Sequence, residues 1–97
     1  MKILCAAIHF DDGIFHISQP KNIQSGFVIC GHRHHNCFHL LGTLVGEDKF
    51  IALNRESVQG FLTDTNEFVT REVAAKIAKD AGQIQEETDR LFSEDLY

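Results

Sequence analysis

The chain has 97 residues, which is enough for one domain with a single hydrophobic core. Its 14 acidic residues outnumber its nine lysines and arginines, and the resulting net charge of −5 disfavours binding to long nucleic acids through their phosphates. No stretch approaches the roughly 20 apolar residues of a transmembrane helix. The three cysteines have no C-x-x-C spacing, which indicates a reducing compartment rather than a disulfide framework. We therefore expect a cytoplasmic protein without a membrane partner and, because a small domain buries little surface, a homo-oligomer.

Two short apolar runs near the start of the chain flank an Asp-Gly pair, Asp12-Gly13. Because glycine adopts the positive φ that a tight turn requires, this pattern predicts a β-hairpin with strands at 3–10 and 13–17. A further apolar run bounded by glycines predicts a third short strand at 27–30.

Apolar residues then recur at spacings of three and four, which is the pattern of one helical face. They are Cys37, Leu40, Leu41, Leu44 and Val45. The pattern predicts a helix at about 33–45. No Ser, Thr or Asp stands directly before Arg33, so the first turn of this helix lacks the usual side-chain cap. Another short strand is expected at 50–53.

A cluster of turn residues at 63–66 precedes the second predicted helix, at 71–81. Thr70 is suited to cap the start of this helix, and Gly82 stands where the helix is expected to stop. Apolar residues in the terminal segment 91–97 favour docking of the tail on the domain. Together these elements predict an α+β fold, in which a short antiparallel sheet of the N-terminal hairpin and one or two further strands packs with two helices.

The main candidate for a ligand site runs from Gly31 to His34, in a region without acidic residues where a strand gives way to a helix. Helix N-termini favour phosphate or carboxylate because of their unpaired amides and the helix dipole. Arg33 adds a forked donor, His34 offers both a donor and an acceptor, and Gly31 allows close backbone approach. The alternative is an ordinary turn in which Arg33 pairs with Glu94 or Asp95.

A second group of candidate contacts lies further along the chain. Gln59, Phe61 and Thr63 would contribute an amide, a ring and a hydroxyl to recognition of a base, although Phe61 alone is more typical of a core. Arg71 lies in the first turn of a helix, where the dipole disfavours a cation. A ligand phosphate or an acidic group of a neighbouring subunit would explain this position, and a solvated Arg71 is the alternative.

Metal binding and covalent catalysis have weaker support. His35 and His39 are four residues apart on the first predicted helix, but a third ligand is missing, so surface histidines are expected. Cys30 and Cys37 are near histidines, yet their apolar neighbours favour thiols that pack as small hydrophobes. We therefore expect no metal, no cofactor and no catalytic residue.

Five blocks, in order over most of the chain, carry a resemblance to known proteins. They are Ile29-Cys30-Gly31-x-Arg33-His34, Gln59-Gly60-Phe61-Leu62-Thr63, Phe68-Val69-x-Arg71-Glu72-x-Ala74-Ala75-x-Ile77-Ala78, Ala81-Gly82-Gln83 and Leu91-Phe92-Ser93-Glu94-Asp95-Leu96. Together they resemble a widespread family of small proteins encoded by tailed phages and prophages. Within it the chain is similar to the nucleotide sponges that sequester cyclic nucleotide messengers of antiphage defence, such as the CBASS systems, without degrading them.

The resemblance implies an oligomer in the host cytoplasm that holds a small phosphate-bearing nucleotide in pockets. It implies Arg33, His34, Gln59 and Arg71 as the polar contacts. Two other functions stay open. A small hydrolase or transferase would act on a nucleotide through histidine acid/base chemistry, and a protein-interaction inhibitor would block a host factor through its apolar tail and helix face.

Overall fold

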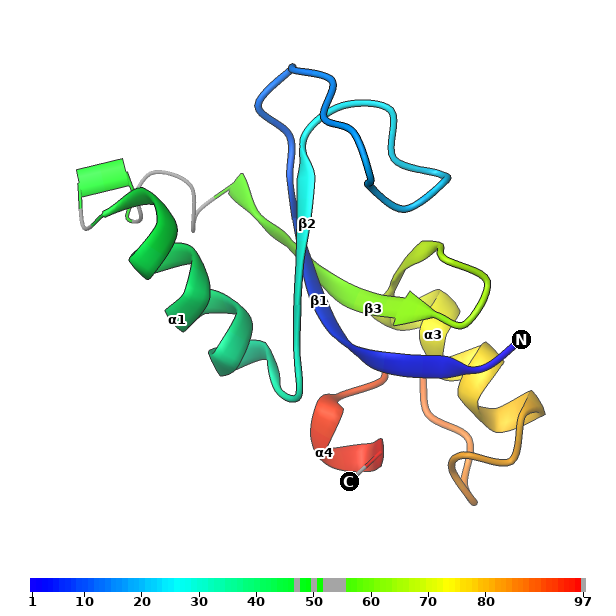
Figure 1. The fold of residues 1–97 in the computed structure, drawn as a ribbon. Helices are drawn as coiled ribbons and strands as arrows, with labels where there is room; N and C mark the ends of the chain where they lie inside the picture. The colour runs from blue at the N-terminus through cyan, green and yellow to red at the C-terminus, as the bar shows by residue number, and fades with distance from the viewer. Residues whose placement is uncertain (47, 50, 52–55, 97) are drawn as a thin grey trace.

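The computed structural model describes residues 1–46, 48, 49, 51 and 56–96 of the chain. Its elements are, in order, β1 (Ile3–Phe10), β2 (Phe27–Gly31), α1 (His34–Val45), β3 (Val58–Thr63), β4 (Phe68–Thr70), α3 (Arg71–Asp80) and α4 (Ser93–Leu96). The strands form one antiparallel sheet in the order β2-β1-β3-β4, of which β1, β2 and β3 are labelled in Figure 1. The predicted α+β fold with two main helices is therefore confirmed.

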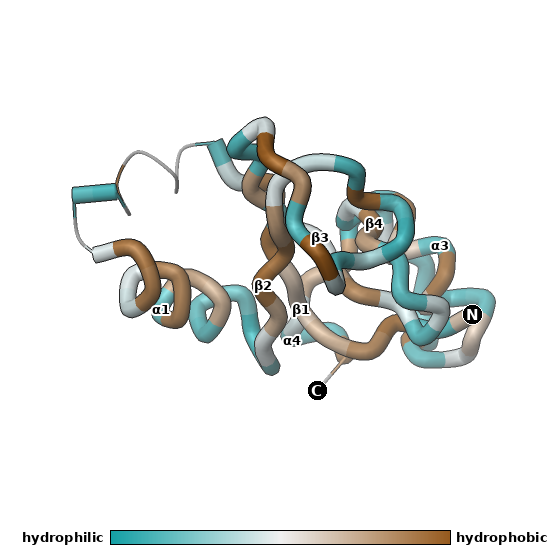
Figure 2. The backbone as a smooth tube through the Cα atoms, turned by 45° about the horizontal axis from the view of Figure 1, so that its top comes forward, coloured by the Kyte–Doolittle hydropathy of each residue, from teal (hydrophilic) through white to brown (hydrophobic). Residues whose placement is uncertain are grey.

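The hydrophobic core lies on one face of this sheet. Because successive strand residues point to opposite faces, Ala6, Ile8 and Phe10 of β1 share a face, and each is at most 1% exposed. The register places Ile29 of β2 and Phe61 of β3 beside them on that face. Buried residues of α1 and α3 belong to the same cluster, so both helices cover this face. Hydrophobic residues accordingly follow the central strands in Figure 2.

The predicted N-terminal hairpin is wrong in its second strand. β1 pairs with β2, which confirms the third predicted strand, and residues 11–26 form a long loop between them (Figure 1). Gly13 does have the expected positive φ, +75°, and the chain bends there. However, the carboxylates of Asp11 and Asp12 accept hydrogen bonds from the backbone amides of Gly13 and Ile14, both at 2.9 Å. Because these amides are bound to local side chains, they do not join a strand ladder.

β3 and β4 form a second hairpin, which the sequence pattern did not predict. The turn predicted at 63–66 joins the two strands, and Asn66 in it has a left-handed φ of 62°. Gly60 of β3 allows β4 to approach, because a Cβ at this position would come within 2.1 Å of the Val69 carbonyl oxygen. Three of the four residues of the strand expected at 50–53 lie outside the described part of the chain.

Both predicted helices are confirmed, and their caps differ. At the start of α1 the backbone N–H of Arg33 donates to Asn36 Oδ1, and the Asn36 N–H donates to the Arg33 carbonyl, both at 3.0 Å. At the start of α3 the Thr70 hydroxyl accepts from the Val73 N–H at 3.4 Å, as predicted, and the helix ends before Gly82. No helix in the described residues is long and apolar enough to cross a membrane.

Amide side chains from the 11–26 loop bind the two edge strands, β2 and β4. The Val28 N–H of β2 donates to Gln19 Oε1 at 2.7 Å. Asn22 binds both backbone groups of Phe68 in β4, because its side chain donates to the carbonyl at 2.7 Å and accepts from the N–H at 2.9 Å. The loop is therefore fastened to both edges of the sheet.

The C-terminal segment docks on the domain, as predicted. Leu91 is 0% exposed within the hydrophobic cluster, and its N–H donates to the Arg71 carbonyl at 3.0 Å. Ser93 is also buried, and the Phe92 N–H donates to Asp95 Oδ2 at 2.9 Å, which opens the short helix α4. The tail is thus tied to the start of α3.

Candidate functional site

The sheet register brings the starts of α1 and α3 to the same part of β3. One residue from each strand forms a row, in which Gly31 pairs with Ala6, Ala6 with Phe61, and Phe61 with Val69. α1 begins shortly after Gly31, and α3 begins shortly after Val69. Their first residues, His34 and Arg71, therefore meet beside β3.

His34 is held in a fixed orientation at this junction. The residue is 8% exposed, and its ring meets the Phe61 ring edge-on with 5.1 Å between the ring centres. The Gly60 carbonyl can only accept, so His34 Nε2 carries the proton and donates to it at 2.8 Å. Nδ1 is then the acceptor, and Arg71 Nη2 lies 3.4 Å from it. Burial, together with the nearby Arg71 charge, lowers the pKa of His34 below its ordinary value of 6.5, which favours this neutral ring.

Arg71 is the central cation of the region. Its Nη2 donates to Gln59 Oε1 at 2.7 Å, and its guanidinium carbon lies 4.7 Å from the centre of the Phe92 ring. Its Nε is buried and has no hydrogen-bond partner among the described residues. Burial and the charge of Arg90 lower the pKa of Arg71 from its ordinary value, although a guanidinium stays charged at neutral pH.

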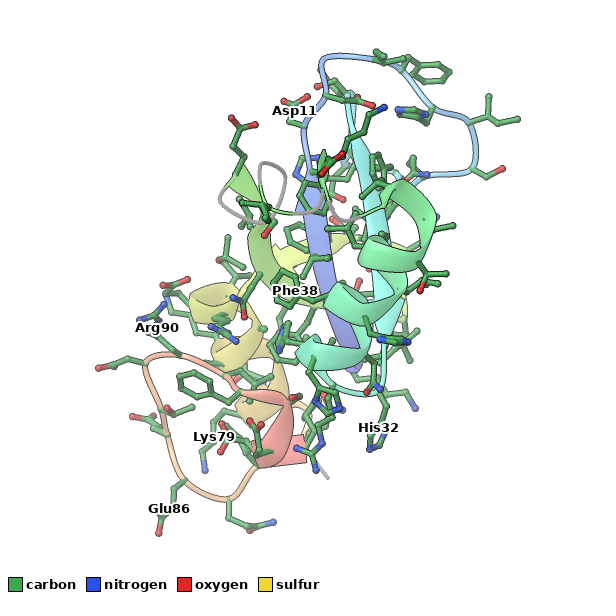
Figure 3. The ribbon with its side chains drawn as sticks, turned by 90° about the vertical axis from the view of Figure 1, so that its left-hand side faces the viewer. Asp11, His32, Phe38, Lys79, Glu86 and Arg90 are labelled. Atoms are coloured by element: carbon green, nitrogen blue, oxygen red, sulfur yellow. The ribbon has the colours of Figure 1, made fainter. Side chains whose placement is uncertain are left out.

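A hollow of about 330 Å³ opens beside Arg71. It is lined by Ser57, Val58, Gln59, Thr70, Glu72 and Arg90 as well as by Arg71. The Nε of Arg90 lies 3.6 Å from a carboxylate oxygen of Glu72, so the hollow has both a cationic and an anionic wall. Figure 3 shows Arg90 beside α3. The volume is at the small end of the range of ligand pockets.

Arg33 forms the ion pair that was the alternative to an open anion site. Its Nη1 lies 3.9 Å from Glu94 Oε1, and the two side chains are 24% and 74% exposed. The negative charge of Glu94 also acts on His34 and Arg71, where it partly offsets the burial that lowers their pKa values. The exposed carboxylate of Glu94 therefore interacts electrostatically with three basic groups, those of Arg33, His34 and Arg71.

Four of the predicted contact residues lie in this region, namely Arg33, His34, Gln59 and Arg71. Arg71 contacts both His34 and Gln59 directly, and Glu94 links this group electrostatically to Arg33. We call this set, together with Phe92 and Glu94, the Arg71 region.

The other three predicted contact residues have structural roles. Gly31 permits close packing of β2 on α1, since a Cβ there would come 3.0 Å from the Asn36 Cβ. Phe61 is 0% exposed, so it presents no free face to a base and instead supports His34. Thr63 is 1% exposed, and its hydroxyl lies 2.9 Å from that of Thr65 in the hairpin turn. It stands four residues beyond Gln59, about 13 Å along an extended strand.

Cys30, Cys37 and the remaining helix histidines show no activated arrangement. Cys37 is fully buried and its Sγ is 3.6 Å from two backbone carbonyl oxygens, and burial raises its pKa to about 11. The Cys5 thiol and burial also raise the pKa of Cys30. His35 and His39 are exposed, and no group of three or more metal-binding side chains occurs in the described residues.

Phe92 and Glu94 belong to the region, but the sequence did not assign them to it. The apolar terminal segment predicted docking of the tail, and Glu94 was named only as an alternative partner of Arg33. The local sequence of the tail does not indicate which element it packs against, so the place of docking was not predictable.

Comparison with known proteins places the chain in a family. No curated protein and no solved structure gives a significant match to it. The family model described as phage T4 y16D protein matches residues 2–97. Because the match spans nearly the whole chain, the protein belongs to this phage protein family.

Proposed function

We propose that this phage protein binds a phosphate-bearing nucleotide messenger of antiphage defence at the Arg71 region and sequesters it without cleaving it. The observation that carries the proposal is the Arg71 guanidinium, whose Nε is buried without a hydrogen-bond partner in the described part of the chain. Buried polar groups in proteins are normally satisfied. A phosphate group supplies several acceptor oxygens in the geometry that a guanidinium fork matches.

The backbone around Arg71 adds to this positive field. α1 and α3 both start in the region, and helix N-termini carry partial positive charge and unpaired amides. The first turn of α1 contains no acidic residue. A compact anion would therefore be favoured here despite the acidity of the whole protein, because the field at a site depends most on nearby groups.

Contacts to a base or sugar are available next to the cation. The Gln59 amide lies against Arg71 and lines the adjoining hollow. Phe92 is 42% exposed, so part of its ring is open to a planar group, and it replaces Phe61 as the aromatic candidate.

Sequestration without turnover is supported by the state of His34. Both of its ring nitrogens are engaged, one with the Gly60 carbonyl and one with Arg71. Such a ring positions its neighbours and has no free nitrogen for proton transfer to a substrate. This observation favours a binding protein over a hydrolase or transferase.

Isothermal titration against cyclic di- and trinucleotides and ADP-ribose derivatives tests the proposal. We expect tight binding of at least one of these ligands, and recovery of the intact ligand after denaturation of the protein. Arg71→Ala should weaken binding at least tenfold, because hydrogen bonds to charged groups contribute about 1.5–3 kcal/mol. Lys76→Ala removes one exposed positive charge from the same helix and should leave binding unchanged.

The outcomes separate the three functional classes. Recovery of a cleaved ligand would support the enzyme instead. An inhibitor that acts on a host protein through its tail would bind none of the nucleotides, and its antidefence effect in infected cells would be unaffected by Arg33→Ala or Arg71→Ala.

The proposal includes a homo-oligomer in the host cytoplasm. Ile14, Phe15 and Ile17 in the 11–26 loop are 58%, 72% and 78% exposed, which is unusual for neighbouring large apolar side chains of a small domain. Size-exclusion chromatography with light scattering tests this part, and a mass of 11.0 kDa, that of one chain, would contradict it.

A further inference from the structure

The Glu94 carboxylate is a weak partner for the cations beside it. It lies 3.9 Å from Arg33 Nη1, which is longer than the distance of about 2.7–2.9 Å found in strong charge-assisted hydrogen bonds. Its side chain is 74% exposed, so water screens the interaction. Replacing this carboxylate by another anion therefore costs little free energy.

A ligand phosphate would form more interactions at this site than the Glu94 carboxylate does. Glu94 reaches Arg33, while the Arg71 fork bonds to Gln59 and lies near His34. A phosphate carries a larger charge than a carboxylate and has more acceptor oxygens, so it can form more charge-assisted hydrogen bonds to guanidinium groups than the Glu94 carboxylate forms at 3.9 Å.

The anchoring of the C-terminal segment allows the Glu94 side chain to move while the backbone stays in place. The neighbouring Ser93 is 2% exposed, and Leu91 is 0% exposed and hydrogen-bonded to the Arg71 carbonyl, so the backbone on this side is anchored. Rotation about the side-chain bonds of Glu94 carries its carboxylate into solvent without unseating either anchor.

We propose that Glu94 occupies the position of an anionic group of the ligand, so that an incoming phosphate displaces its carboxylate and Glu94 sets the affinity of the Arg71 region for anions. This inference rests on the proposed function and adds that the Glu94 carboxylate competes with the ligand for the same cations. The backbone of the tail keeps its place during the exchange, and Phe92 stays over Arg71.

Inorganic pyrophosphate is the probe for a first test. Its binding is monitored by NMR of the His34 ring and the Arg71 Nε–H. Glu94→Gln keeps the shape of the side chain and removes its charge. We expect it to tighten pyrophosphate binding about 1.5-fold to fivefold, the range for loss of one exposed like charge. Glu86→Gln is the matched control, because Glu86 lies at the far end of the loop between α3 and α4 (Figure 3) and is exposed.

A second readout needs no ligand. Since the charge of Glu94 raises the pKa of His34, Glu94→Gln should lower that pKa further, and Glu86→Gln should not. Pyrophosphate affinity equal in the natural protein and Glu94→Gln, or a gain of the same size in Glu86→Gln, would overturn the inference, as would no pyrophosphate binding by either protein.

The nucleotide titrations separate this failure from failure of the proposed function. Tighter pyrophosphate binding without any nucleotide binding would refute nucleotide sequestration and keep Glu94 as an anion competitor. A nucleotide that binds the natural protein and Glu94→Gln equally would keep the proposed function and refute the role of Glu94.

Discussion

Leu91→Ala tests whether the C-terminal segment is part of the core. Leu91 is 0% exposed and lies in the same cluster as residues of the sheet and both helices. Truncation to alanine removes three carbon atoms, about 2.4 kcal/mol of transfer free energy at ~0.8 kcal/mol per methylene group. The cavity that remains adds to this loss, so we expect the free energy of unfolding to fall by about 3 kcal/mol.

Urea unfolding followed by far-ultraviolet circular dichroism measures the change. With a slope of about 1–1.5 kcal/mol per molar urea for a small domain, the midpoint should fall by about 2–3 M. The control is Leu44→Ala, the same substitution at a 64% exposed position of α1, which should change the free energy of unfolding by less than about 0.5 kcal/mol. Equal losses in the two variants would refute the burial of Leu91 in the core.

Four further predictions concern other parts of the molecule. Gly60→Ala should prevent normal closure of the β3–β4 hairpin, because its Cβ would meet a backbone oxygen at 2.1 Å, and the melting temperature should fall steeply. Thr70→Ala should lower the free energy of unfolding by about 1 kcal/mol through loss of the α3 cap, measurable by urea unfolding. Because burial lowers the pKa of His34 in the folded state, the unfolded state binds its proton more readily, and stability should decrease as the pH falls through and below about 6.5. His34→Gln should flatten this dependence in unfolding experiments between pH 7 and pH 5. Iodoacetamide at pH 7 should alkylate Cys5, whose pKa is lowered to about 7 chiefly by the Cys30 thiol, well before the buried Cys37, as peptide mass spectrometry would show.

The helices were predictable because their signals are local. Apolar spacing defined α1, and a threonine before the first turn and a glycine after the last turn defined α3. The N-terminal hairpin failed for a physical reason that a pattern of apolar residues does not contain. The Asp11 and Asp12 side chains capture the amides after the turn, and the partner of β1 is supplied instead by β2.

The candidate site was predictable as a set of residues but not as an arrangement. Arg71 was a candidate because the helix dipole disfavours a cation at a helix N-terminus unless an anion is nearby. His34 was a candidate because it follows the end of a strand. Their contact depends on the register between four strands, which joins parts of the chain that are far apart in sequence. Phe92 and Glu94 reach the site only through the docking of Leu91 in the core.

The loop that binds both edge strands also limits how copies of the protein can meet. Exposed strand edges are templates on which further chains add by backbone hydrogen bonding, which leads to aggregation. Asn22 offers Phe68 the donor and the acceptor that a neighbouring strand would offer, and Gln19 takes up the Val28 amide on the other edge. Sheet extension is blocked at these two positions, so the protein is protected there against fibrous stacking of its copies.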